Sequence, residues 1–360
     1  MKNFFTYKKS GVDYDLIDPL KKLAQKEGLS TRFNIKKTGF KEISESRGES
    51  AYIIESSECY YAFVIEGLGT KNLVADEVRK ITGRSYYDLI AQDTVAMIVN
   101  DLITVGAKPL TINAYWAVGN SEWFNDKKRM NDLINGWKKA CDLAGATWGG
   151  GETPVLTDII YPNTIDLAGS AFGIITPKNR LILGDKIAAG DDIIFLASSG
   201  IHANGLTLAR KILAKTKDKK AFGQLLLTPT IIYAKVINEI LNGGADIHYL
   251  VNITGHGWRK LMRAKKSFSY EINDVSSVPE IFQFIQKQAR LSDKEMYATF
   301  NMGAGFAVIV NPKDAEKVLA VSKKHNIKAW IGGSVNKGPK QVIINPLEFI
   351  YKSEELNIRK

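Results

Sequence analysis

The apolar positions of this chain follow two spacings, which predicts a mixture of strands and helices. Continuous apolar runs predict strands at Cys59–Ile65, Ile165–Ile175, Ile193–Ala197, Gly305–Val310 and Gln341–Asn345. Helical spacing and helix-start signals predict helices at Ser85–Val105, Asp132–Ala144, Asn204–Ala214, Pro229–Leu241, Pro279–Gln288 and Pro312–His325. Because strands and helices alternate throughout, we expect an α/β or α+β fold.

The segment from Thr176 to Asp192 interrupts this alternation, because it is rich in charges, glycine and turn formers. A chain of 360 residues is also too long for one ordinary core. We therefore expect two domains, residues 1–175 and 176–360.

The Ser85–Val105 helix has one apolar and one polar face at about 100° per residue. Its polar face carries Asp93, Asn100, Asp101 and Thr104, with Met97 among them. A solvated face is the ordinary interpretation of such a pattern. However, this face has no Lys or Glu, and short carboxylate and amide oxygens suit Mg²⁺. The pattern leaves both interpretations open.

The composition indicates a soluble globular protein, with 45% hydrophobic and 24% charged residues. A net charge of +11 suggests an anionic partner, but the lysines are spread out and lack interleaved aromatics, which favours a solvated surface over a nucleic-acid groove. No apolar run reaches the roughly 18 residues of a membrane span, and we expect neither a membrane nor a nucleic-acid partner. Two cysteines, Cys59 and Cys141, sit beside apolar residues and predict buried thiols in a reducing, cytoplasmic compartment.

A glycine turn follows the first predicted strand in the sequence "IEGLGTK". It contains Glu66, Gly67, Gly69, Thr70 and Lys71. The turn could be only a tight connection, since glycine supplies left-handed backbone conformations. Alternatively, its acid and lysine could serve a metal and a phosphate.

A second glycine turn, "WGGGETP", joins Gly150 and Gly151 to Glu152. It is either a simple turn or a loop that brings backbone close to a nucleotide and adds another acid.

The second half contains a strand that ends in "SSGIHANG", before a predicted helix. Ser199, His202, Asn204 and Gly205 lie in this stretch. Small hydroxyls and free N–H groups at a helix start are suited to anions. An Asn helix cap with a surface histidine explains the pattern equally well.

Two more glycine turns follow, "NITGHGWRKL" and "FNMGAGF". Arg259 and Lys260 lie near the start of the helix expected after "NITGHG". They either face a bound anion or are plain surface charges. Asn301, Gly303 and Gly305 in the second form either a backbone cradle or a bulge. Together the turns suggest one site for phosphorylated ligands at a domain or subunit interface.

These motifs, in this order, resemble the phosphoribosylformylglycinamidine cyclo-ligase (aminoimidazole ribonucleotide synthetase) family. The match runs from Tyr7 to Gln341 through "GLGTK", "NDLITVGAKP", "GGET", "SSGIHANG", "LLTPTIIYAK" and "EMYATFNMGAGF". The family belongs to a wider ATP-binding superfamily with selenophosphate synthetase and thiamine-monophosphate kinase. The resemblance implies a two-domain synthetase fold whose N-terminal sheet pairs across a homodimer.

The resemblance also implies an activity, which is the ATP-dependent closure of formylglycinamidine ribonucleotide to aminoimidazole ribonucleotide. It implies that Mg²⁺ is held by Glu66, Asp93, Asp101 and Glu152. It implies catalytic roles for Lys71, which would neutralise phosphate charge, and for Asp101 and His202. Nucleotide or ribonucleotide contacts are implied for Gly67, Gly69, Thr70, Asn100, Gly150, Gly151, Ser199, Asn204, Gly205, Thr254, Gly255, Asn301 and Gly303.

The chain departs from the family pattern in three places. The family's glycine-rich loop is replaced by the nearly glycine-free "KTGFKEISESRGESAYII", Glu66 replaces an aspartate, and His256 interrupts a run of three glycines. Two alternatives therefore stay open. One is a superfamily kinase or synthetase acting on another small phosphorylated substrate, and the other is a degenerate basic binding protein.

Overall fold

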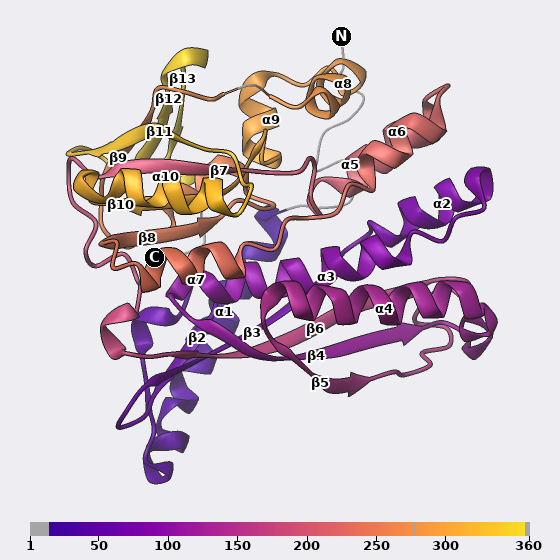
Figure 1. Cartoon of the computed structure of the whole chain (residues 1–360), viewed down its shortest axis with the longest axis horizontal. Helices are drawn as coiled ribbons and strands as arrows, with labels where there is room; N and C mark the ends of the chain where they lie inside the picture. The colour runs from indigo at the N-terminus through magenta and orange to yellow at the C-terminus, as the bar shows by residue number, and fades with distance from the viewer. Residues whose placement is uncertain (1–13, 277, 357–360) are drawn as a thin grey trace.

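The computed structural model describes residues 14–276 and 278–356, so the Tyr7–Asp13 start of the expected motif match lies outside the described residues. Two β-sheets, one from each half of the chain, form separate layers with helices between and around them (Figure 1). The expected mixed α/β class is confirmed.

The first half builds a six-stranded sheet of order β1-β2-β3-β6-β4-β5. Its strands are β1 (Lys41–Glu42), β2 (Tyr52–Glu55), β3 (Tyr60–Gly67), β4 (Lys108–Val118), β5 (Thr147–Glu152) and β6 (Ile165–Ile175). Its helices are α1 (Tyr14–Ser30), α2 (Asn72–Thr82), α3 (Tyr87–Leu102) and α4 (Lys127–Ala144), with 3₁₀ turns η2 (Thr31–Thr38), η3 (Ser44–Ser46), η4 (Ile103–Val105) and η5 (Ser121–Asn125).

The second half builds a seven-stranded sheet of order β13-β12-β9-β11-β7-β10-β8. Its strands are β7 (Asp192–Ala197), β8 (Ile247–Asn252), β9 (Ser269–Ile272), β10 (Ala304–Val310), β11 (Ala329–Asn336), β12 (Gln341–Ile344) and β13 (Phe349–Lys352). Its helices are α5 (Leu206–Lys215), α6 (Lys219–Leu226), α7 (Ala234–Asn242), α8 (Glu280–Ala289), α9 (Asp293–Thr299) and α10 (Ala315–Lys324). Short 3₁₀ turns include η6 (Lys178–Arg180), η7 (Gly257–Arg263) and η8 (Pro312–Asp314).

Two expectations about local structure are wrong. The helix expected from Pro229 begins only at Ala234, because residues 228–233 form an irregular segment that is bonded to α3. The "WGGGE" segment is the edge strand β5, not a turn, because it pairs in parallel with β4. A Cβ at Gly151 would lie 2.3 Å from the Ala114 carbonyl oxygen, so the pairing itself requires glycine there.

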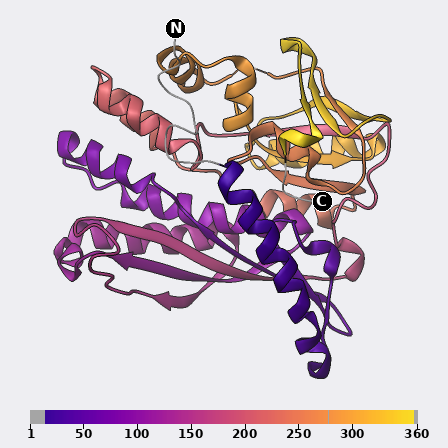
Figure 2. The same ribbon diagram turned by 180° about the vertical axis from the view of Figure 1, so that it is seen from behind.

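The segment that replaces the family's glycine-rich loop forms β1, η3 and the start of β2. An ion pair between Arg47 and Glu42, 2.8 Å long, holds it together, and Tyr52 donates a further hydrogen bond to Glu42. Just before it, α1 and η2 extend past the edge of the first sheet as an arm (Figure 2).

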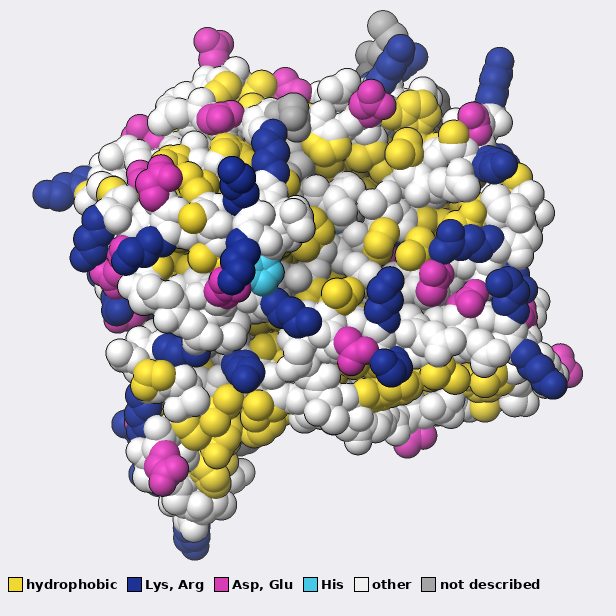
Figure 3. Space-filling model, viewed as in Figure 1, with side chains coloured by type: hydrophobic (Ala, Val, Ile, Leu, Met, Phe, Trp, Pro, Cys, Tyr) yellow, Lys and Arg dark blue, Asp and Glu magenta, His cyan; other side chains and the backbone are white. Residues whose placement is uncertain are grey.

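The surface agrees with a dispersed positive charge, since Lys and Arg side chains are scattered over the face drawn in Figure 3. In the described part of the chain, no helix has the length and apolar character needed to cross a bilayer. Both cysteines are buried free thiols, as expected.

Candidate functional site

The polar face of α3 does not face solvent, contrary to the ordinary interpretation of its pattern. Asp93, Asn100 and Asp101 are 0%, 1% and 5% exposed. They bond to groups from the second half of the chain. The bonds from this face include Gln92 Nε2 to Thr230 O (2.9 Å), Asn100 Nδ2 to Ile231 O (2.8 Å), Tyr233 N to Asn100 Oδ1 (2.9 Å) and Asn252 Nδ2 to Asp101 Oδ1 (2.7 Å). The helix therefore joins the two halves, and Asn100 anchors backbone instead of lying free for a nucleotide.

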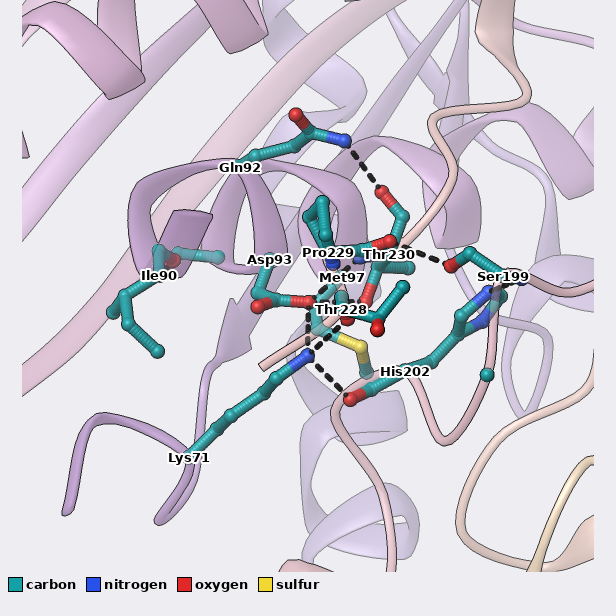
Figure 4. A network of polar contacts seen from close by, with 12 residues as sticks. Lys71, Ile90, Gln92, Asp93, Met97, Ser199, His202, Thr228, Pro229 and Thr230 are labelled. Carbon is teal, nitrogen blue, oxygen red and sulfur yellow. Dashed lines mark hydrogen bonds and ion pairs between the residues drawn. The ribbon is translucent and has the colours of Figure 1, made fainter. Parts of the chain in front are cut away.

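Lys71 lies at the centre of a second set of contacts between the halves (Figure 4). Its side chain is fully buried, and its ammonium donates to Asp93 Oδ1, His202 O and Thr228 O, each at 2.8 Å. An ammonium has three N–H donors, and all three are used. All of its donors are therefore used in this structure, and its expected contact with a phosphate stays a prediction.

His202 is buried as well, at 3% exposure, and is not the surface histidine of the alternative interpretation. Its Nε2 accepts a hydrogen bond from the Ser199 N–H (3.2 Å), which requires that this nitrogen carry no proton. Burial, and secondly the Lys71 charge, lower the pKa of His202 to about 3. At neutral pH the ring is uncharged, so it acts as an acceptor within its loop.

Asn301 ties three of the predicted glycine turns together. Its Oδ1 accepts from Ser198 Oγ and Gly303 N–H, both at 2.9 Å, and its Nδ2 donates to the Gly200 carbonyl at 2.9 Å. Its own carbonyl accepts from Trp258 Nε1 at 2.8 Å. Asn301 thus links the 198–200 turn, the 301–303 turn and Trp258 at the start of η7, and the shared ligand site expected from these turns stays a prediction.

Glycine is required at one point in this arrangement. Gly205 has φ +76°, and a Cβ there would lie 2.1 Å from Phe300 Cε1. It also occupies the cap position of α5, so the expected Asn204 side-chain cap is not formed.

Glu66 near the end of β3 and Asp101 near the end of α3 are close enough for their charges to interact, and the buried Lys260 of η7 interacts with both. Burial, and secondly the Asp101 carboxylate, raise the pKa of Glu66 to about 7, against the opposing charges of Lys260 and Arg263. Lys260 is 5% exposed and donates to the Asn252 carbonyl (3.2 Å) and, through a short bond, to Thr254 Oγ1. Two carboxylates and an ammonium from three elements thus converge.

The four acids expected to hold Mg²⁺ do not form one site. Asp93 and Asp101 are eight residues apart on α3, which is about 12 Å at 1.5 Å per residue. Glu152 lies on β5, three strands from β3, or about 14 Å at the usual strand spacing, and is exposed. Among residues 14–276 and 278–356, no three His, Cys, Asp or Glu side chains are grouped to hold a metal. The described residues therefore do not gather these four acids at one point, and their role in holding Mg²⁺ stays a prediction.

The pair of Glu66 and Asp101 nevertheless fits a magnesium ion. Burial is the main cause of the raised pKa of Glu66 and the charge of Asp101 the second, and a divalent cation would relieve the repulsion between the two carboxylates. Mg²⁺ is commonly bound by one or two carboxylates, with phosphate oxygens and water completing the shell.

The remaining expected residues fall into two groups. Some follow Glu66 in sequence or lie beside Lys260, and the others lie apart on β5. Gly67 ends β3, and Gly69 (φ +74°) and Thr70 follow in the turn before α2. Thr254 bonds to Lys260, and Gly255 is its neighbour. Gly150 and Gly151 lie with Glu152 on β5.

Sequence reasoning left Lys260 open between an anion-binding cation and a surface charge, and it missed two participants, Thr230 and Asn252. The "LLTPTIIYAK" motif contained a signal for Thr230, because it marked the segment that docks on α3. Asn252 ends an apolar strand and offered no such signal.

Comparison with known proteins connects this geometry to a family. Residues 48–175 match the model of the AIR synthase related protein N-terminal domain, and residues 188–345 match that of the C-terminal domain. The chain is 34% identical over 339 residues to the phosphoribosylformylglycinamidine cyclo-ligase of Methanococcus maripaludis, with 92% of each chain covered. It is 36% identical over 340 residues to the enzyme of the same name from Methanocaldococcus jannaschii, again with 92% of each covered. The corresponding protein of Carboxydothermus hydrogenoformans is 34% identical over 359 residues, covering 94% of this chain and 98% of that one.

Solved structures share the fold. The HypE–HypF complex matches with TM-score 0.62 at 18% identity, covering 85% of this chain and 93% of that chain. The hydrogenase maturation protein HypE in complex with ATP matches with TM-score 0.56 at 18% identity, covering 75% and 81%. T. maritima PurL complexed with ATP matches with TM-score 0.55 at 15% identity, covering 85% of this chain and 46% of PurL.

Proposed function

Since the chain belongs to the phosphoribosylformylglycinamidine cyclo-ligase family, we propose that it performs the ring closure of de novo purine biosynthesis. In this reaction ATP and formylglycinamidine ribonucleotide give aminoimidazole ribonucleotide, ADP and phosphate. The observation that carries the proposal is the identity of about one third over nearly the whole length of several such enzymes.

The chemistry has two parts. The γ-phosphoryl group of ATP is transferred to the formyl oxygen of the substrate, and ADP leaves. A substrate nitrogen then attacks the formyl carbon, the carbon–oxygen bond breaks, phosphate leaves and the nitrogen loses a proton. Positioning and charge neutralisation contribute most of the catalysis in phosphoryl transfer of this kind.

The Glu66–Asp101 pair is the part of the chain that we assign to the triphosphate. These two residues would hold Mg²⁺, which when bound would neutralise charge on the phosphates. Lys260 interacts with both carboxylates and would supply positive charge there, while burial lowers the pKa of its ammonium. The assignment of this charge to Lys260 replaces the one expected for Lys71.

The loops at 198–205, 254–257 and 301–303 are our candidates for the ribonucleotide. Because the side chains of Ser199, His202 and Asn301 bond within the loops, contacts to the substrate phosphate would come mainly from backbone N–H groups. Asn204 is the exception, since among the described residues its amide makes only a long contact, 3.8 Å, to the Met97 sulfur.

We further propose a homodimer that pairs through the outer face of the first sheet. Ile65 and Phe63 on β3 are 77% and 39% exposed. Phe172 on β6 packs against Tyr61 and Phe63, with ring centroids 5.2 and 5.0 Å apart. Ile65→Glu should shift the sedimentation of the protein from dimer to monomer, and an unchanged dimer would argue against this face.

The function is tested by measuring ADP release with purified protein, Mg-ATP and formylglycinamidine ribonucleotide. We expect release that requires both the ribonucleotide and Mg²⁺, together with formation of aminoimidazole ribonucleotide. A folded protein that shows neither would overturn the proposal. Calorimetric titration with Mg-ATP, with and without the ribonucleotide, separates failure to bind from failure to react.

The replacement at Glu66 and the interruption at His256 favour one alternative, which is a related ATP-dependent enzyme with another small phosphorylated substrate. ATP consumption with a different acceptor, and none with formylglycinamidine ribonucleotide, would support it. Salt-dependent nucleic-acid binding without ATP binding would instead indicate the degenerate basic binding protein.

A further inference from the structure

We propose that Lys71 and Asp93 form a positioning pair for the reaction, which holds the 198–205 loop and the 228–233 segment in place on α3. The pair contacts neither nucleotide nor metal in this proposal. The inference rests on the proposed function for its kinetic consequences, but its structural part can be tested separately.

The first step concerns the donors of Lys71. The ammonium is fully buried, and its three bonds of 2.8 Å go to one carboxylate and two carbonyl oxygens. A phosphate could bind to it only by displacing one of these acceptors. The two carbonyls belong to His202 and Thr228, 131 and 157 residues away in sequence. One side chain therefore fixes two distant loops.

The second step concerns Asp93, whose Oδ1 is the common acceptor of this network (Figure 4). It accepts from Lys71 Nζ and Thr230 N at 2.8 Å each and from Thr230 Oγ1 at 2.5 Å. Oδ2 is also buried and has no hydrogen-bond partner among the described residues. A buried charge pair with an unsatisfied oxygen contributes little net stability, which favours a role in fixing geometry.

The third step connects the two loops to each other. Ser199 Oγ donates to the Pro229 carbonyl at 2.6 Å, and Ser199 N donates to His202 Nε2 at 3.2 Å. His202 adopts φ +58°, a left-handed conformation that a non-glycine residue keeps only when its surroundings hold it there. Lys71 supplies part of that restraint by binding the His202 carbonyl. Loss of the pair would therefore shift the loop that we assign to the ribonucleotide.

The test compares Lys71→Met, which keeps the length and removes the charge, with Asp93→Asn and the double variant. Lys80→Met is the matched control, because Lys80 lies on α2 and its ion pair with Glu77 is exposed. We expect Lys71→Met to raise the KM for the ribonucleotide by about tenfold and to change the Kd of Mg-ATP by less than about twofold. Adding Asp93→Asn should recover part of kcat/KM, about threefold, because no uncompensated buried charge remains.

Two results would overturn the proposal. One is a loss of Mg-ATP affinity of about tenfold or more in Lys71→Met, which would indicate contact with phosphate. The other is the absence of recovery in the double variant. If Lys71→Met does not fold, Thr230→Val provides a second test, because it removes one bond to Asp93 without changing any charge. We expect it to raise the KM for the ribonucleotide as well, but by less than Lys71→Met.

Hydrogen exchange separates this inference from the proposed function. In the double variant, amides of the 198–205 and 228–233 segments should exchange faster than in Lys80→Met, while those of β3 should not. If the parent protein fails to turn over the ribonucleotide, the proposed function fails, and the exchange result still decides the positioning role. Unchanged exchange in both segments would refute that role.

Discussion

The buried His202 makes the stability of this protein depend on pH in a direction that can be worked out. Its pKa is lowered from 6.5 to about 3, first by burial and then by the charge of Lys71. The unfolded chain regains an ordinary histidine. Between these two pKa values the unfolded state binds one proton more than the native state, so the free energy of unfolding falls as pH falls.

The size of the effect follows from the two pKa values. Each pH unit inside the window changes the free energy of unfolding by about 1.4 kcal/mol for one proton. Integrating the proton linkage of His202 gives a loss of about 2 kcal/mol between pH 7 and pH 5. Most of that loss occurs below pH 6.5, where the unfolded histidine becomes protonated.

Urea unfolding of the parent and His202→Gln at pH 7 and pH 5 measures this loss. Glutamine keeps an acceptor for the Ser199 N–H and removes the titrating group, so any baseline change in stability cancels in the pH difference. We expect the parent to lose about 2 kcal/mol more than the variant, with equal m values. Equal losses in the two proteins would show that His202 titrates normally and that the account of its burial is wrong.

Three further changes test other parts of the structure. Gly305→Ala should lower the free energy of unfolding, measured by urea unfolding, by about 3 kcal/mol, because the added Cβ would lie 2.1 Å from Tyr233 Oη. The control Gly243→Ala, whose added Cβ would have nearest contacts of 3.4 and 3.5 Å, should change this free energy by less than about 0.5 kcal/mol. Asn100→Leu should lower the free energy of unfolding by about 3 kcal/mol, because it leaves the buried Tyr233 N–H and the half-buried Ile231 carbonyl unbonded. A Kd of Mg-ATP that also rises tenfold would contradict its purely structural role. Glu66→Asp should keep or raise the rate of ADP release and Glu66→Ala should abolish it, whereas an active alanine variant would remove this acid from the metal site.

The sequence predicted elements well where local pattern decides the structure. The strand Ile165–Ile175 was predicted with both ends correct, since its inward positions alternate with small or half-exposed ones. The helix predicted from Pro229 begins late because hydrogen bonds to α3, more than 130 residues away, hold residues 228–233 in an irregular segment. The expectation of a turn at "WGGGE" is wrong for a similar reason, since the composition of this segment does not reveal its pairing with β4. Local preference could not reveal partners so distant in sequence.

The candidate site shows the same limit at the level of single side chains. A short polar face on a helix has one pattern whether it meets water, a metal or another domain, so the sequence could not distinguish these for Asp93 and Asp101. Two turns of helix separate them, and that distance alone assigns them to different tasks: Asp93 pairs with a buried ammonium, and Asp101 lies beside Glu66. The same limit applies to the lysines. Lys71, from the glycine motif, donates to backbone carbonyls, whereas Lys260, from a turn whose role the sequence left undecided, lies near Glu66 and Asp101. A motif therefore identified the region of the site, and only the fold could assign a partner to each charge.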